Sequence, residues 1–330
     1  MKELKLSQSF AMIALNAQDS INMTAVKKVS LHAIAASVVL ETYLDGEFSV
    51  VEDNKLSLKK SYLDKPNVTL YQEAIFNSLF NKRDEITENL NWWLSKASSL
   101  SKKNLKKLEV AIIDSLKCCD CIEEIPNLLG CDMYYKTAGL SLREYRSNID
   151  EYTRIVEGLK ADTLEEGVVN DESIFMLWLL RESGCMQDVF SKGDLEIIYN
   201  KINLLFISNK FSKELYNISI YHGLEMTIKG FINMKKNAIK TPIGTGINFV
   251  FPFLERSQSI FIDTEEWLPT AEQRLTEVKK RLEDNGHSYI ILRMGDVPLI
   301  KIDNIIYELI PEAIQGRVSI HGVRLRRYCI

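Results

Sequence analysis

Hydrophobic periodicity changes from mainly helical to mainly strand-like in the last third of this chain of 330 residues, and the change limits the fold more than any other feature of the sequence. Up to about residue 225, apolar residues recur every three or four positions, which is typical of amphipathic helices. Past a stretch with one proline and two glycines at 237–246, short aliphatic and β-branched runs flank one charged helical segment. We therefore predict a mainly α chain, in which a helical domain with small β-hairpins (1–235) is joined by a linker (236–256) to a small α+β domain (257–330).

The same patterns place the individual elements. Apolar stripes at helical spacing predict eight helices in the first domain, and Thr24 can cap the second of them. Asp53-Asn54 and Asp303-Asn304 each lie between two short apolar runs, which indicates a β-hairpin at each place. Between 122 and 135 the helical spacing is lost, and a third hairpin is predicted there. The predicted helices are 6–16, 24–44, 69–80, 86–97, 102–119, 142–159, 171–182 and 192–205; the C-terminal domain has strands at 259–262, 288–293, 299–302 and 305–309 and a helix at 271–284.

Composition excludes several classes of protein. The chain is 46% hydrophobic and 26% charged, as ordinary globular proteins are, so it is neither collagen-like nor largely disordered. Its 41 basic and 45 acidic residues give a net charge of −4, which argues against binding nucleic acid through overall positive charge. No signal peptide is visible, and the most apolar stretch, 33–40, is far shorter than the ~20 residues that span a bilayer. We expect a cytoplasmic protein that binds no nucleic acid.

The sequence contains no recognisable catalytic or metal-binding motif. Cys118, Cys119, Cys121 and Cys131 are clustered, but two of these thiols are adjacent, and no histidine or second cysteine pair is near in sequence. We interpret them as small hydrophobic residues buried at a helix end. The four histidines are far apart, and no serine-hydrolase or metalloprotease motif occurs. We therefore predict no catalytic residues, no metal and no cofactor, although only the absence of a motif argues against an enzyme.

A group of lysines is the main candidate for a binding surface. Four lysines open the helix predicted at 102–119, where spacings of three and four residues place them on one face. Such a face is either simply solvated, or it binds anions and acidic membranes, where each lysine near the surface contributes about 1 kcal/mol. Two more lysines begin the helix predicted at 24–44, and they join this face only if the fold brings the two helices together. The candidate anion-binding residues are Lys102, Lys103, Lys106, Lys27 and Lys28.

The hairpin predicted at 122–135 carries apolar residues at its turn. Ile125, Leu128 and Leu129 lie beside Pro126, and exposed apolar side chains at such a tip usually mark a contact surface. In this interpretation they form the contact of a homo-oligomer. In the alternative interpretation, the tip folds back on the core of its own domain.

Five segments, in their order along the chain, carry a resemblance to a known family. They are an opening helix, an apolar helix with an internal glutamate, an Asn-Trp segment, an apolar hairpin strand and a leucine-rich helix. Together they cover about residues 4–210 and resemble the Golgi phosphoprotein 3 family, which includes bacterial relatives. The segments lie at 6–15, 37–48, 91–94, 128–135 and 173–190.

The resemblance implies a mostly helical peripheral membrane protein that recognises phosphatidylinositol 4-phosphate, serves as an adaptor for the tails of membrane enzymes and self-assembles through its hairpin. The head-group pocket of the family uses a Trp and an Arg near the second helix and two Arg, three residues apart, on a later helix. These positions fall on Val26, Ala35, Lys106 and Glu109 of this chain. Because lysine lacks the bidentate fork of arginine and Glu109 repels a phosphate, we expect weak binding that follows lipid charge rather than head-group identity.

The functional prediction combines the lysines with this resemblance. We expect a non-enzymatic, cytoplasmic adaptor that docks weakly on anionic membranes or phosphoinositide-like head groups, peripherally on the inner membrane surface. The alternative is a soluble interaction or regulatory scaffold that does not bind lipid. The sequence suggests no function for the C-terminal α+β domain.

Overall fold

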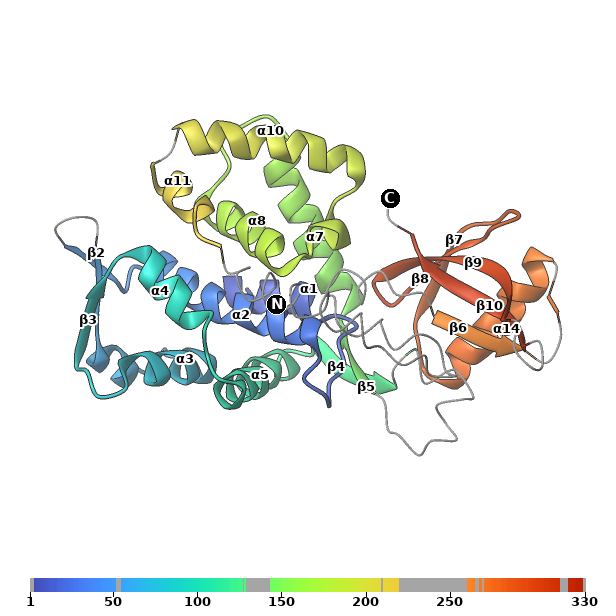
Figure 1. The fold of residues 1–330 in the computed structure, drawn as a ribbon, viewed down its shortest axis with the longest axis horizontal. Helices are drawn as coiled ribbons and strands as arrows, with labels where there is room; N and C mark the ends of the chain where they lie inside the picture. The colour runs from blue at the N-terminus through green and yellow to red at the C-terminus, as the bar shows by residue number, and fades with distance from the viewer. Residues whose placement is uncertain are drawn as a thin grey trace, which may run out of the picture. The chain divides into compact units, whose positions relative to one another are not determined.

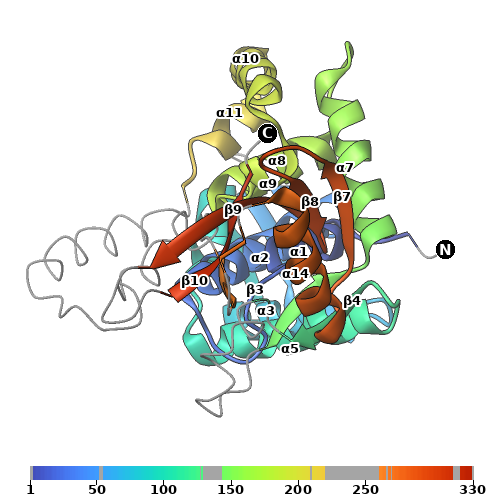
Figure 2. The same cartoon turned by 90° about the vertical axis from the view of Figure 1, so that its right-hand side faces the viewer.

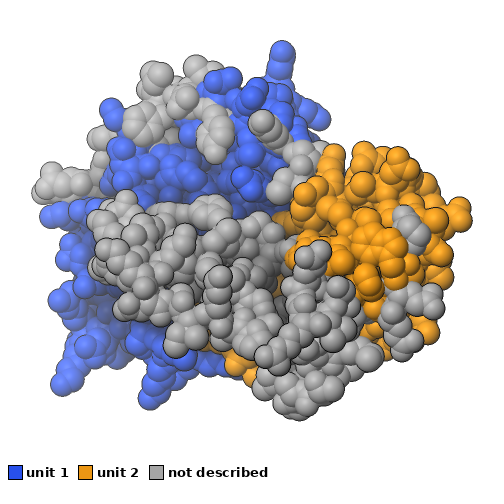
Figure 3. Space-filling view, turned by 45° about the vertical axis from the view of Figure 1, so that its right-hand side comes forward, with its two compact units in different colours: residues 1–14, 27–121, 151–239 blue, residues 15–26, 122–150, 240–330 orange. Residues whose placement is uncertain are grey.

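The chain folds into two compact units, neither of which is continuous in sequence (Figure 3). In the computed structural model, unit 1 comprises residues 1–14, 27–121 and 151–239, and unit 2 comprises 15–26, 122–150 and 240–330. This division differs from the predicted one, because two segments of the predicted helical domain belong with the C-terminal residues. The predicted linker 236–256 lies outside the described residues, which are 3–51, 55–126, 128, 143–208, 210–219, 260–264, 267–268, 270–314 and 320–328.

Unit 1 consists mainly of helices together with one small antiparallel sheet (Figure 1). Most of the predicted helices are confirmed to within a few residues, and β1 pairs with β2 as the first hairpin prediction requires. Helices α1, α2 and α7 each have one end in a segment of unit 2. The elements are α1 (Leu6–Leu15), α2 (Ala25–Leu44), β1 (Ser49–Val51), β2 (Lys55–Lys59), the 3-10 helix η2 (Lys60–Asp64), α3 (Leu70–Phe80), β3 (Glu85–Glu88), α4 (Leu90–Ala97), α5 (Lys102–Lys117), α7 (Ile149–Leu164), α8 (Asp171–Ser183), α9 (Met186–Val189), α10 (Lys192–Ser208) and α11 (Lys210–Tyr216).

One buried carboxylate joins three helices of unit 1. Glu41 of α2 accepts hydrogen bonds from the backbone N–H of Ser7 on α1 (2.9 Å), from the Tyr71 hydroxyl (3.0 Å) and from Nε2 of Gln72 on α3 (3.1 Å). Burial raises the pKa of Glu41, although its hydrogen bonds with Ser7 favour the ionised form. Because a buried carboxylate without such donors is costly, these contacts fix where α1 and α3 meet α2.

Aromatic rings fill the core beside the small sheet. Trp93 of α4 packs edge to face on Phe48 and Phe76, with ring centroids 5.0 Å and 6.2 Å apart. Its Nε1 donates a hydrogen bond to the carbonyl of Leu56 at 3.1 Å. This one side chain therefore ties α4 to both β2 and α3.

Two predicted helices begin later than expected, because a strand precedes each of them. β3 pairs with β2, and the Asn89 side chain then accepts a hydrogen bond from the Trp92 backbone N–H at 2.8 Å, which begins α4 at Leu90. Likewise, β5 (Arg143–Ser147) precedes α7. β5 pairs with β4 (Ile122–Pro126) in unit 2, whereas the sequence predicts the return strand of β4 within 128–135, of which only Leu128 is described.

The C-terminal part of unit 2 forms a five-stranded antiparallel sheet with one helix against a face of it (Figure 2). Leu275, Val278 and Leu282 of this helix pack with sheet residues such as Ile300 and Leu309. The predicted helix at 271–284 and the hairpin at Asp303-Asn304 are both confirmed. In strand order, the sheet is β6 (Ile260–Thr264), β10 (Ile320–Arg327), β9 (Ile305–Ile314), β8 (Leu299–Ile302) and β7 (Tyr289–Arg293), and the helix is α14 (Ala271–Asp284).

Strand β10 is absent from the sequence prediction, because its arginines hide its strand character. Arg324 and Arg326 form ion pairs with Glu312 and Glu308 on the neighbouring strand β9. Cross-strand pairs of opposite charge stabilise an antiparallel ladder.

No helix in the described part of the chain combines the length and the apolar character needed to cross a bilayer.

We expect His32, in the middle of α2, to make the protein less stable in acid. Burial and, secondly, the charge of Lys28 lower the pKa of His32 from 6.5 to about 4. The folded state keeps this imidazole neutral while the unfolded chain takes up the proton. Its contribution to stability is therefore complete above pH 6.5 and is lost as the pH falls towards 4. Urea unfolding near pH 7 and pH 5 should show a larger loss of unfolding free energy in the wild type than in His32→Gln; equal losses would contradict the prediction.

Candidate functional site

The predicted lysines of α5 lie together on its solvent side. Lys102, Lys103 and Lys106 are exposed, and so is Lys107 in the same two turns; we refer to these four residues as the lysine face. The opposite side of the helix is buried in unit 1. The first turn of α5 contains no acidic residue. Four positive charges therefore lie near the helix N-terminus, where the helix dipole is positive as well.

Lys27 does not belong to the lysine face, which corrects the prediction. It is fully buried, and its Nζ lies 2.9 Å from Oε1 of Glu109, which is also fully buried. This ion pair joins the start of α2 to α5, so the two helices do meet, as the prediction required. Lys28, the next residue, is exposed.

Glu109 also differs from its predicted role. Its second oxygen, Oε2, lies 3.0 Å from Nζ of Lys106, so two lysines balance its charge. It therefore does not present an unbalanced negative charge to an approaching phosphate. Val26 and Ala35, the other positions suggested by the resemblance, are fully buried apolar residues. Of the four positions, Lys106 alone carries an exposed charge, with 48% of its side chain accessible.

The predicted exposure of Ile125 and Leu128 at the hairpin tip is wrong. Both side chains are buried, and Leu128 packs in the core of unit 2 with Ile300 and Leu309. Leu129 lies outside the described residues. These two apolar residues are thus buried within their own unit, as in the alternative that the sequence analysis left open.

The predicted burial of the cysteines at the end of α5 is only partly confirmed. Cys121 is buried, whereas Cys118 is exposed and Cys119 is partly exposed; Cys131 lies outside the described residues. Burial raises the pKa of the Cys121 thiol, which disfavours the thiolate form that binds metals.

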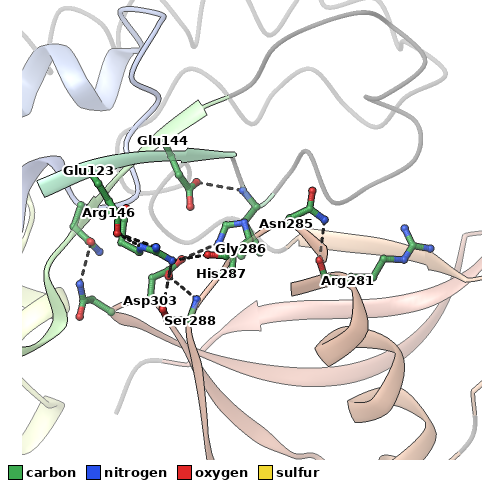
Figure 4. Close-up of polar contacts among 12 residues, drawn as sticks. Glu123, Glu144, Arg146, Arg281, Asn285, Gly286, His287, Ser288 and Asp303 are labelled. Atoms are coloured by element: carbon green, nitrogen blue, oxygen red, sulfur yellow. Dashed lines mark hydrogen bonds and ion pairs between the residues drawn. The ribbon is translucent and has the colours of Figure 1, made fainter. Parts of the chain in front are cut away.

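Unit 2 contains a cluster of polar side chains that sequence analysis did not identify (Figure 4). Glu144 and Arg146 lie on the same side of β5, since side chains alternate along a strand. His287 follows α14, and Asp303 occupies the turn between β8 and β9. We refer to these four residues as the buried cluster: Glu144, His287 and Asp303 are buried, and Arg146 is half-buried. No spacing motif could reveal it, because Arg146 and Asp303 are 157 residues apart in the sequence.

Asp303 is the centre of the buried cluster. Its Oδ2 lies 2.9 Å from Nδ1 of His287, and its Oδ1 accepts hydrogen bonds from Nη1 of Arg146 and the backbone N–H of Ser288, both at 3.2 Å. Arg146 also donates to Glu123 on β4, through Nε at 2.9 Å. The φ of Asp303 is +52°, an uncommon conformation for a residue other than glycine that suits a two-residue hairpin turn. The turn thus holds this carboxylate against both His287 and Arg146.

Glu144 and His287 are less completely paired. Oε2 of Glu144 accepts one long hydrogen bond, 3.4 Å, from the backbone N–H of Leu128. Burial and, secondly, the charge of Asp303 raise the pKa of Glu144 to about 8. Nε2 of His287 is buried and has no hydrogen-bond partner in the described part of the chain. Within the described residues, the Glu144 carboxyl group therefore has one long hydrogen bond, and Nε2 of His287 has none.

The ion pair between Lys27 and Glu109 gives a test of the site geometry. We expect Lys27→Met to destabilise the protein by about 3–5 kcal/mol, because it leaves a buried carboxylate without its principal partner. The double variant Lys27→Met/Glu109→Leu should recover most of this loss, since it removes both buried charges. Chemical denaturation of the three proteins measures both effects. A single variant as stable as the wild type would contradict the burial of this pair.

Comparisons with known proteins give no family for this chain. A scan against models of protein families found none that matches, and a search of curated proteins found no match. The resemblance to the Golgi phosphoprotein 3 family therefore remains a prediction from the residues quoted above.

Proposed function

We propose that the protein is a non-enzymatic peripheral adaptor that docks on acidic membrane surfaces through the lysine face of α5. The observation that carries this proposal is the exposure of Lys102, Lys103, Lys106 and Lys107 on one side of a single helix. Lys28 is exposed on α2, one residue from the lysine that pairs with α5, and supplies a further positive charge.

The position of these lysines on the helix supports a role in binding rather than in stability. Cations near a helix N-terminus oppose the helix dipole, so lysines in the first turn of α5 do not stabilise it. An acidic surface relieves this repulsion between the lysines and the helix dipole, because both attract negative charge. Each lysine close to an anionic leaflet contributes about 1 kcal/mol to binding, so four lysines attach the protein weakly to the membrane.

The same residues argue against selection of one lipid head group. Selective phosphate recognition generally uses the planar, bidentate fork of arginine, whereas a lysine acts as a point charge. The lysine face contains no arginine. Lys106 is already in an ion pair, with its Nζ 3.0 Å from Oε2 of Glu109. Binding should therefore follow the charge density of the membrane and weaken with salt, because exposed charges are screened within about 10 Å at 0.1 M.

Vesicle co-sedimentation of the full chain tests this proposal. We expect binding to vesicles of phosphatidylserine and phosphatidylcholine to increase with the phosphatidylserine fraction and to be reversed by salt. The triple variant Lys102→Glu/Lys103→Glu/Lys106→Glu should bind at least about 100-fold more weakly, since it removes three contributions of about 1 kcal/mol.

The matched control reverses the same number of charges elsewhere in unit 1. Lys55, Lys59 and Lys60 are exposed in or beside β2, and their triple change to glutamate should preserve most of the binding. An equal loss in both triple variants would show that only net charge matters. Absence of binding by the wild type at low salt would favour the alternative, a soluble interaction scaffold, and salt-resistant capture of phosphatidylinositol 4-phosphate alone would instead favour a specific head-group pocket.

A further inference from the structure

We propose that the buried cluster of unit 2 binds a divalent transition-metal ion, with Glu144, His287 and Asp303 as its protein ligands. One ring nitrogen of His287 and one carboxylate oxygen from each of Glu144 and Asp303 lie within 4.8 Å of one another. Zinc ligands lie about 2.0–2.2 Å from the ion, so tetrahedral neighbours are ~3.5 Å apart. The three side chains would need to move closer by only ~1 Å to surround an ion.

The imidazole supplies an observation independent of the acidic groups. His287 is 5% exposed, and its Nε2 has no hydrogen-bond partner among the described residues. Buried polar atoms are normally hydrogen-bonded, so this unpartnered ring nitrogen is open to a ligand or an ion. Oδ2 of Asp303 lies 2.9 Å from the other ring nitrogen, Nδ1, so the imidazole and this carboxylate already meet inside the cluster.

The charges around the site also favour a cation. Glu144 and Asp303 are acidic, and Arg146, which is also paired with the exposed Glu123, is the one strongly basic side chain that contacts this group in the described part of the chain. Asp19 adds a further negative charge that acts on Glu144. Arg146 lies on the side of Asp303 and Glu123, at 3.2 Å and 2.8 Å from their carboxylates. Glu144 itself forms no ion pair with the described residues, and a divalent ion would compensate its carboxylate.

The ligand types select among metals. An imidazole nitrogen with two carboxylates suits Zn²⁺ and related transition-metal ions, whereas Mg²⁺ and Ca²⁺ prefer oxygen ligands alone. Because Glu144 comes from β5 and Asp303 from the turn of the sheet, the ion would tie the hairpin of unit 2 to its sheet. Binding to the folded state alone should then raise the thermal stability of the protein.

The test uses the full chain after treatment with a chelator. We expect Zn²⁺ to raise the melting temperature and to bind with measurable heat in calorimetry, while Mg²⁺ at the same concentration does neither. Glu144→Gln should weaken Zn²⁺ binding by at least about tenfold. The matched control is Glu123→Gln on the same hairpin, whose side chain is 60% exposed, and it should bind Zn²⁺ within about twofold of the wild type. Equal responses to Zn²⁺ and Mg²⁺, or equal losses in both variants, would overturn the proposal.

A measurement on the wild type alone keeps the proposal testable if Glu144→Gln does not fold. X-ray absorption of the zinc-loaded protein should show nitrogen and oxygen ligands that include one imidazole. Sulfur ligands would place the ion at cysteines, such as exposed Cys118, and would overturn the assignment. No zinc retained by the wild type would overturn it as well, and would mean that protons alone balance the buried cluster.

Discussion

Buried charged groups whose partners lie far away in the sequence constrain this fold more than any single apolar contact. A buried charge must be paired or hydrogen-bonded, so each one dictates which distant segments meet. Lys27 and Glu109 are 82 residues apart and bring α2 against α5. Glu41 does the same for α1, α2 and α3. The apolar core fills the space between the elements that these contacts join.

Unit 2 follows the same rule, and this explains why the units are discontinuous in sequence. Arg146 of β5 reaches Asp303 in the turn of the C-terminal sheet at 3.2 Å. Asn304, the next residue, donates through Nδ2 to the carbonyl of Ser147 at 3.0 Å and to Oδ1 of Asn16 at 3.2 Å. Three segments that are remote in sequence thus share one polar network, which no local periodicity records.

Elements with a complete local signal were predictable from the sequence. The helix at 271–284 has its amphipathic stripe and a capping box between Thr270 and Gln273, and both ends were predicted correctly. The strands β3 and β5 were missed because each has only four or five residues and runs directly into a helix, so the helical pattern extends over it. Strand β10 was missed because its arginines gain their partners only across the sheet.

The candidate sites show the same limit. The exposure of the lysine face follows from helical spacing, because Leu105 and Leu108 take the buried side of α5 and leave the lysines outside. The burial of Lys27 could not be foreseen, since a lysine enters a core only when a distant carboxylate receives it. Glu144, His287 and Asp303 are single residues from three elements, and only the fold brings them together. Local pattern therefore identifies surfaces, whereas buried polar sites require the tertiary structure.

The central claim is that the lysine face of α5 is the surface that meets an acidic membrane. Lysine acylation followed by mass spectrometry measures it directly on the unmodified chain, with and without phosphatidylserine vesicles at low salt. The account predicts that Lys102, Lys103, Lys106 and Lys107 lose reactivity on the vesicles, while the exposed lysines of β2, Lys55 and Lys59, keep theirs. Protection that is equal at all of these lysines, or confined to those of β2, would contradict it.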